Sequence, residues 1–208
     1  MSSEYSEHTL PPQVNAALLD RVRGMLLGLA IGDSLGNTTE GQLPTDRRAR
    51  YGEIRGYLPN RYVNGERVGT PTDDTQMAFW TLGHLLEYET VVPEKLAEAF
   101  AAHRIFGIGS TVRDFIATYK AHREDDWRMW GRPSAGNGAL MRIPPLSLTP
   151  WLVPMAPGSG PPREIVKELT LRAAALTHND PASNSSCVAL SMLCFDLLTG
   201  VGRPEEAA

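Results

Sequence analysis

Hydrophobic residues recur at steps of three and four over most of this chain, which is the period of an amphipathic α-helix. The segments that show this period are 16–36, 73–86, 93–104, 111–122, 163–177 and 182–198. No stretch of useful length alternates between apolar and polar residues, as a half-buried strand would. The pattern therefore predicts an all-α protein, with residues 14–200 as a single domain between tails at 1–13 and 201–208.

Two of these helices have an unusual surface. In the first, Gly24, Gly28 and Gly32 repeat every four residues, which predicts a smooth face against which another backbone packs closely. The last, 182–198, is apolar almost all the way round, so we expect it to be buried on every side. Each large apolar side chain left exposed forgoes about 1.5–3 kcal/mol. An oligomer, a partner chain or further sequence is therefore expected to cover this helix.

The composition and charge of the chain argue against several classes of protein. The 208 residues carry a net charge of −4 and no basic block of the kind that binds nucleic acid. The chain has no run of about 20 apolar residues and begins with a polar Ser/Glu stretch, so we expect neither a membrane span nor a secretion signal. Cys187 and Cys194 lie seven residues apart in one helical pattern, roughly 10 Å and beyond disulfide reach. Free thiols indicate a reducing, cytoplasmic location.

The sequence Thr72-Asp73-Asp74 stands directly before an apolar helical run, with no Lys or Arg beside it. One interpretation is ordinary capping, with Thr72 as the N-cap and the two acids stabilised by the helix dipole. The other is a site for a hard cation, because carboxylate and hydroxyl oxygens suit Mg²⁺ or Mn²⁺. These residues alone leave both interpretations open, and capping is the commoner use of such a helix start.

The stretch Ser134-Ala135-Gly136-Asn137-Gly138 combines small residues with two glycines, which lets backbone N–H groups converge on an anion. A tight turn is the alternative interpretation. The stretch lacks the Gly-Lys-Ser/Thr ending of a Walker loop, and no strand precedes it as in a dinucleotide-binding fold. His178 ends the helix 163–177, where it either caps the helix or contacts a ligand.

Together these stretches resemble the ADP-ribosylglycohydrolase family, which are all-α hydrolases that remove ADP-ribose from arginine, serine or other acceptors. The matching stretches, in the family's order, are 23–36 (RGMLLGLAIGDSLG) with Glu40, 72–77 (TDDTQM), 136–142 (GNGALMR) and 176–178 (LTH). The resemblance implies an orthogonal multi-helix bundle. It also implies hydrolysis of the N- or O-glycosidic ribosyl bond of an ADP-ribosylated protein or small molecule.

The resemblance further implies roles for individual residues. Thr72, Asp73 and Asp74 match the family's first metal-ligand motif, for a pair of Mg²⁺ or Mn²⁺ ions. Asp33 would support that site by contacting the metal ligands and not the metal. Glu40 and Asp74 are the catalytic candidates, with Glu40 suited to gating or acid–base work near the scissile ribose. Metal ions can hold the ribose diol and polarise a water molecule while positive charge builds at the anomeric carbon.

Gly136, Asn137 and Gly138 match the loop that cradles the diphosphate, and His178 matches a substrate-contacting histidine. One family motif has no counterpart here. Nothing after His178 resembles the late Gly-Asp-Thr-Asp type of stretch that supplies the other metal ligands. We therefore expect a C-terminally incomplete bundle, half of a two-metal site, and weak or no turnover by this chain alone. The alternative hypotheses are a non-catalytic ADP-ribose-binding protein and a truncated remnant.

Overall fold

The computed structural model describes residues 13–154 and 161–201, so nearly all of the two expected tails lies outside the described residues. Within these ranges the chain is helical and forms no β-strand, which confirms the predicted all-α class. The α-helices are α1 (Ala16–Gly36), α2 (Pro44–Tyr51), α3 (Asp73–Tyr88), α4 (Pro93–Ala102), α5 (Ser110–Ala121), α6 (Thr149–Leu152), α7 (Pro162–Ala175) and α8 (Pro181–Thr199). Short 3₁₀ helices are η1 (Asn37–Thr39), η2 (Arg61–Val63), η3 (Trp127–Met129), η4 (Leu140–Arg142) and η5 (Pro144–Leu148).

The helices predicted from apolar periodicity are all present, with small differences at their ends. Pro93, Pro162 and Pro181 lie in the first turns of α4, α7 and α8. Proline favours a helix start because its fixed φ is helical and its missing N–H would have no intrahelical partner there. Cys187 and Cys194 are both free, as their spacing predicted.

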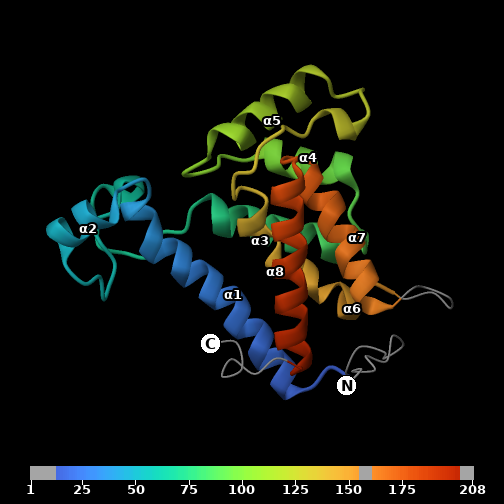
Figure 1. Ribbon diagram of the computed structural model, residues 1–208, viewed down its shortest axis with the longest axis horizontal. Helices are drawn as coiled ribbons and strands as arrows, with labels where there is room; N and C mark the ends of the chain where they lie inside the picture. The colour runs from blue at the N-terminus through green and yellow to red at the C-terminus, as the bar shows by residue number, and fades with distance from the viewer. Residues whose placement is uncertain (1–12, 155–160, 202–208) are drawn as a thin grey trace.

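The main core forms where α3, α4, α5 and α7 pack around the irregular segment 139–148. Figure 1 shows α7 and α8 side by side, with α3 crossing behind them. Apolar side chains at helical spacing point into this core, as the periodicity predicts. The largest of them include Met77, Leu85, Leu96, Phe100, Phe115, Trp130, Ile143, Leu146 and Leu176.

Helix α1 contacts the rest of the molecule along one face, where Val22 and Met25 pack against apolar side chains in the middle of the helix. At its start Leu18 packs against Leu198 of α8, and its last turns meet the start of α3. Between these contacts, a Cβ placed on Gly24, Gly28 or Gly32 would meet no atom within 4 Å. The prediction of a closely packed glycine face is therefore wrong for the described chain. Regular glycine spacing makes a helix face smooth but does not supply a neighbour for it.

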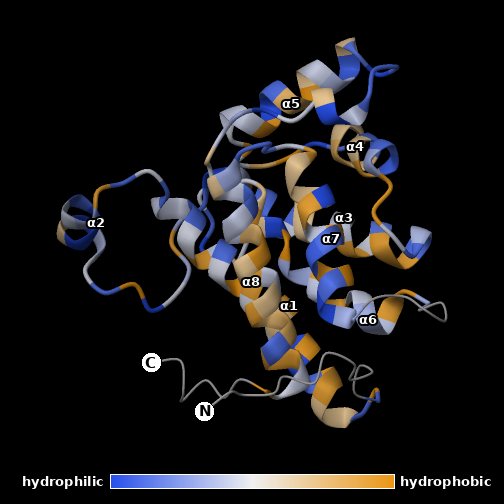
Figure 2. Ribbon diagram, turned by 45° about the vertical axis from the view of Figure 1, so that its right-hand side comes forward, coloured by the Kyte–Doolittle hydropathy of each residue, from blue (hydrophilic) through white to orange (hydrophobic). Residues whose placement is uncertain are grey.

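Helix α8 buries one face only. On the opposite face Leu193 is 49% exposed, so the described residues do not bury this helix on every side, and its expected cover by a partner or further sequence stays a prediction. By length and composition alone α8 could cross a membrane, but core helices of soluble proteins also pass that test. Figure 2 shows hydrophobic residues along both α8 and α1. The buried face of α8 consists of Ser183, Cys187, Ser191, Phe195 and Leu198.

Helix α2 lies in residues 41–71, which we call the arm and in which the sequence showed no period. None of the α2 residues is buried, and a helix without a buried face shows no apolar period. The arm stands away from the body of the molecule (Figures 1 and 2). Asn37 closes its base, because its Nδ2 donates to the Thr70 carbonyl (2.7 Å) and its Oδ1 accepts from Asn60 (3.0 Å).

Candidate functional site

Asp33, near the end of α1, caps the start of α3. Its Oδ2 accepts from the backbone N–H groups of Thr72 (2.6 Å) and Thr75 (3.2 Å) and from the Thr75 hydroxyl (2.6 Å). Its Oδ1 accepts from the Thr72 hydroxyl (2.6 Å). Thr72 is the N-cap residue by position, but its side chain makes no capping bond, so the interpretation of Thr72 as a side-chain cap is wrong. Asp33 satisfies N–H groups that a helix start leaves free, and it fixes the Thr72 hydroxyl.

Asp73 is buried beside the connection between α4 and α5, with 7% of its surface exposed. Gly107 lies against it with φ at +77°, and a Cβ there would come within 2.9 Å of Asp73 Oδ1. The backbone of Gly109 hydrogen-bonds to Asp73. Burial raises the pKa of Asp73, and the charges of Glu40 and Asp33 add to the rise. The polypeptide thus encloses one side of this carboxylate closely.

Burial raises the pKa of Asp74 to about 6, and the charges of Asp73, Asp33 and Glu40 add to the rise. We call these four side chains the acidic cluster. None of them forms an ion pair with a Lys or Arg of the described chain. A cation would relieve this repulsion, and carboxylate oxygens are the ligands that Mg²⁺ and Mn²⁺ prefer.

The acidic cluster does not by itself form a full set of metal ligands. The described residues contain no group of three or more His, Cys, Asp or Glu side chains placed to hold one metal ion. Both oxygens of Asp33 are occupied by Thr72 and Thr75, and Glu40 lies exposed after η1. The oxygen atoms of Thr72, Asp73 and Asp74 could therefore form only part of a divalent-cation site.

His178 is buried beneath the glycine loop, residues 136–138. After α7 ends, the chain forms an isolated bridge between Arg132 and His178, which holds this turn in place. A Cβ on Gly138 would lie 2.7 Å from His178 Cε1 and 3.0 Å from Nε2, so only glycine lets the ring come this close. The His178 side chain bonds to the Thr177 hydroxyl, and it does not cap α7. The structure therefore brings together the two stretches that the sequence placed 40 residues apart.

The first turn of α5 connects the acidic cluster to the glycine loop. Gly109, its N-cap residue, bonds to Asp73, and the Thr111 hydroxyl lies 3.0 Å from Ser134 Oγ. Ser134 Oγ in turn accepts from the Gly136 N–H (3.3 Å). No side chain caps α5, so its free N–H groups and its dipole favour an anion at this place. The acidic cluster and the glycine loop therefore border one site.

Sequence reasoning missed this part of the site. The stretch 107–111 (GIGST) resembles 134–138 (SAGNG) in having two glycines and at least one hydroxyl residue, and it precedes a predicted helix. That similarity was the available signal. Asn137 was singled out, but its side chain is exposed and forms no hydrogen bond with the described residues, while its carbonyl accepts from the Met141 N–H (3.0 Å).

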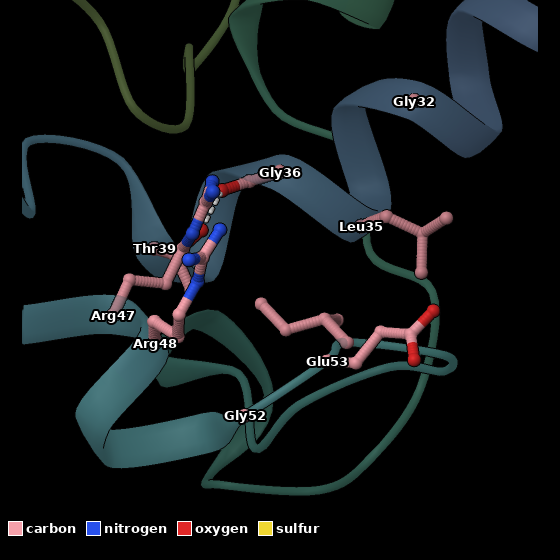
Figure 3. A pocket seen from close by; sticks show the side chains of 9 residues that line it. Gly32, Leu35, Gly36, Thr39, Arg47, Arg48, Gly52 and Glu53 are labelled. Carbon is pink, nitrogen blue, oxygen red and sulfur yellow. Dashed lines mark hydrogen bonds between the residues drawn. The ribbon is translucent and has the colours of Figure 1, made fainter. Parts of the chain in front are cut away.

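A cavity of about 660 Å³ opens between the end of α1 and the arm. Figure 3 shows Arg47 and Arg48 of α2 extending into it toward Gly36 and Thr39. No residue of the acidic cluster or the glycine loop lines this cavity. The arm therefore places two cationic side chains in a cavity that is separate from the acidic cluster.

Comparison with known proteins identifies the family of this chain. The family model described as ADP-ribosylglycohydrolase matches residues 14–208. The ADP-ribosyl-[dinitrogen reductase] glycohydrolase of Rhodospirillum rubrum is 31% identical over 194 residues, which cover 90% of this chain and 62% of that protein. The ADP-ribosylarginine hydrolase Tri1 of Serratia proteamaculans is 34% identical over 201 residues, which cover 90% of this chain and 50% of that protein.

A solved structure, described as an ADP-ribosylglycohydrolase-related protein complex, has the same fold. It matches with a TM-score of 0.68 and 28% sequence identity, over 93% of this chain and 60% of that one. The chain thus spans between half and about three fifths of the length of these relatives.

Proposed function

This chain belongs to the ADP-ribosylglycohydrolase family, and on that premise we propose that it hydrolyses the ribosyl bond between ADP-ribose and a modified acceptor. One observation carries the proposal: the first turn of α5 touches both Asp73 and Ser134, and so joins the acidic cluster to the glycine loop. An ADP-ribosyl group needs both environments. Its diphosphate is an anion that suits backbone N–H groups, and its ribose presents a diol that suits a bound cation.

The residues divide between two tasks. Thr72, Asp73 and Asp74 would hold a Mg²⁺ or Mn²⁺ ion, which when bound holds the ribose diol and polarises a water molecule. Asp33 keeps the Thr72 hydroxyl in a fixed position through its 2.6 Å hydrogen bond. Asp74 and the exposed Glu40 are the carboxylates that can accept the proton of the attacking water.

The other task is to hold the nucleotide. Backbone N–H groups of the loop 136–138 and of the uncapped start of α5 would bind the diphosphate. His178, beneath this loop, would contact the substrate from the same side. The acceptor is proposed to be an ADP-ribosylated protein, and arginine is the linkage to test first because relatives are named for dinitrogen reductase and for arginine. The base of the arm is tied to Asn37 at the end of α1, and we propose that the arm contacts the acceptor.

Calorimetry with ADP-ribose, in the presence of Mg²⁺, tests the binding half of the proposal. We expect the full 208-residue chain to bind ADP-ribose and Gly138→Ala to bind it at least about tenfold more weakly, because its methyl group would displace His178. Gly83→Ala is the matched control, since a Cβ there meets no atom within 4 Å. Absence of binding at millimolar ADP-ribose would overturn the proposal.

Release of ADP-ribose from ADP-ribosylarginine, with Mg²⁺ or Mn²⁺, tests the chemical half. Turnover by this chain alone is expected to be slow but measurable, because the described carboxylates provide only part of a metal site. The second candidate function is a non-catalytic ADP-ribose-binding protein. The incomplete set of metal ligands in the described residues favours it. Tight ADP-ribose binding with no hydrolysis under either metal would replace the hydrolase by that candidate.

A further inference from the structure

We propose that Arg142 is a positioning residue that acts through Thr177 to keep the proton of His178 on Nε2, where it can donate to an oxygen of the bound ligand. The identity of that ligand, an ADP-ribosyl group, rests on the proposed function. The placement of the proton does not, because it follows from three side chains that lie next to one another in the structure.

Arg142 lies in η4 and is completely buried. Its Nη2 donates to the Ala173 carbonyl (2.8 Å) and to the Thr177 hydroxyl (2.8 Å), and its guanidinium lies 4.9 Å from the centre of the Phe100 ring. No carboxylate of the described chain pairs with it, and its Nε and Nη1 have no hydrogen-bond partner there. An apolar side chain would fill this space at less cost, so packing alone does not explain an arginine here.

Burial lowers the pKa of Arg142 to about 10, so the guanidinium stays protonated at neutral pH. An arginine side chain can only donate hydrogen bonds. Arg142 therefore fixes the direction of its bond to Thr177, whose hydroxyl oxygen must be the acceptor.

The hydroxyl of Thr177 has one hydrogen left to donate, and His178 Nδ1 lies 2.9 Å from its oxygen. No other acceptor in the described residues bonds to this fully buried hydroxyl. If Nδ1 carried the proton and donated to Thr177, the hydroxyl hydrogen would be buried without an acceptor, which is unfavourable. The arrangement that satisfies every group has Thr177 donating to Nδ1.

A neutral imidazole carries one proton, so an accepting Nδ1 places the proton on Nε2. Burial, with the nearby charge of Arg142, lowers the pKa of His178 to about 4, so the ring is neutral at physiological pH. Nε2 has no hydrogen-bond partner among the described residues. A Cβ built on Gly138 would lie 3.0 Å from it and one on Gly136 would lie 3.6 Å from it. A single unpaired N–H from a residue that is 1% exposed thus points at the glycine loop.

Long-range ¹H–¹⁵N NMR of the imidazole rings tests the proposal directly, with His178→Gln used to assign the signals. In the full chain we expect the His178 proton on Nε2. Thr177→Val keeps the shape of the side chain and removes the hydroxyl, so Nδ1 loses its donor and the ring is expected to populate the Nδ1–H tautomer. Thr177→Ser retains the hydroxyl and is expected to restore the wild-type tautomer.

Affinity for ADP-ribose gives the second readout. We expect Thr177→Val to bind about tenfold more weakly, the effect of losing one hydrogen bond, and Thr177→Ser to bind as the wild type does. A wild-type proton on Nδ1, or a Thr177→Val variant with unchanged tautomer and affinity, would overturn the proposal. If the wild-type chain does not bind ADP-ribose, the proposed function fails, while the tautomers of the wild type and of the Thr177 variants still decide whether Thr177 keeps the proton of His178 on Nε2.

Discussion

Replacing Asp74 by asparagine is expected to stabilise the protein at neutral pH when divalent cations are removed. The ordinary pKa of the group is 3.8 and its folded pKa is about 6, so the folded protein binds the proton more tightly than the unfolded chain does. The contribution to stability is fully present below pH 3.8 and is lost as the pH rises through about 6. Above that pH the charged carboxylate opposes folding, because it is partly buried beside Asp73, Asp33 and Glu40.

The size of the effect follows from the same two values. At 1.36 kcal/mol per pH unit, the difference between 3.8 and about 6 sets an upper limit of ~3 kcal/mol. Solvent reaches part of Asp74 and screens its charge, which reduces the expected gain to ~1 kcal/mol. For a chain of 208 residues this corresponds to a rise in melting temperature of about 2–4 °C.

The assay is thermal unfolding of wild type and Asp74→Asn in chelator at pH 7.5 and again below pH 4, where the gain is expected to disappear. Adding Mg²⁺ at pH 7.5 is expected to raise the melting temperature of the wild type more than that of the variant. Glu94→Gln is the control, because Glu94 also lies in the first turn of a helix but is exposed and outside the acidic cluster. An Asp74→Asn variant that melts lower than wild type in chelator would refute the reasoning, since a carboxylate that merely complements the helix dipole stabilises the fold.

Two further outcomes follow from the same contacts. Asp33→Ala removes the acceptor of five hydrogen bonds and is expected to lower the free energy of unfolding by ~2–4 kcal/mol in urea. Glu53→Ala on the exposed arm should change it by less than ~0.5 kcal/mol, and equal effects of the two variants would show that the cap contributes nothing. Asp73→Asn is expected to weaken Mn²⁺ binding at least about tenfold in calorimetry, and an unchanged affinity would reduce Thr72-Asp73-Asp74 to an ordinary helix start.

Periodicity was sufficient to predict each α-helix of ten or more residues in the described chain. It could not predict α2, because none of the α2 residues is buried and its sequence therefore has no apolar stripe. It also gave the wrong environment for Gly24 and Gly28. Spacing within a helix describes the surface that the helix offers, whereas what lies against that surface depends on residues far away in the sequence.

In the candidate site, too, local sequence revealed some residues but not the contacts between residues that are distant in the sequence. Thr72, Asp73 and the loop 136–138 stood out because each stretch has an unusual composition of its own. The capping of α3 by Asp33 joins residues 39 positions apart, and no local pattern encodes it. The role of Arg142 was hidden for a related reason, since only the folded chain brings its guanidinium to the Thr177 hydroxyl.

The hydrogen bonds of Asn37 fix the base of the arm, so the position of the site residues does not depend on how long the arm is. Asn37 lies where the chain enters the arm, and it hydrogen-bonds to Thr70, where the chain leaves it, and to Asn60. The entering and leaving segments are therefore held together at the base of the arm. Doubling the length of a closed loop adds only about 0.6 kcal/mol of closure entropy. Residues can therefore be inserted into or deleted from the arm at little energetic cost and without displacing Thr72. Under the proposed function, changes in the arm would alter the surface offered to the acceptor while the acidic cluster and the glycine loop keep their form.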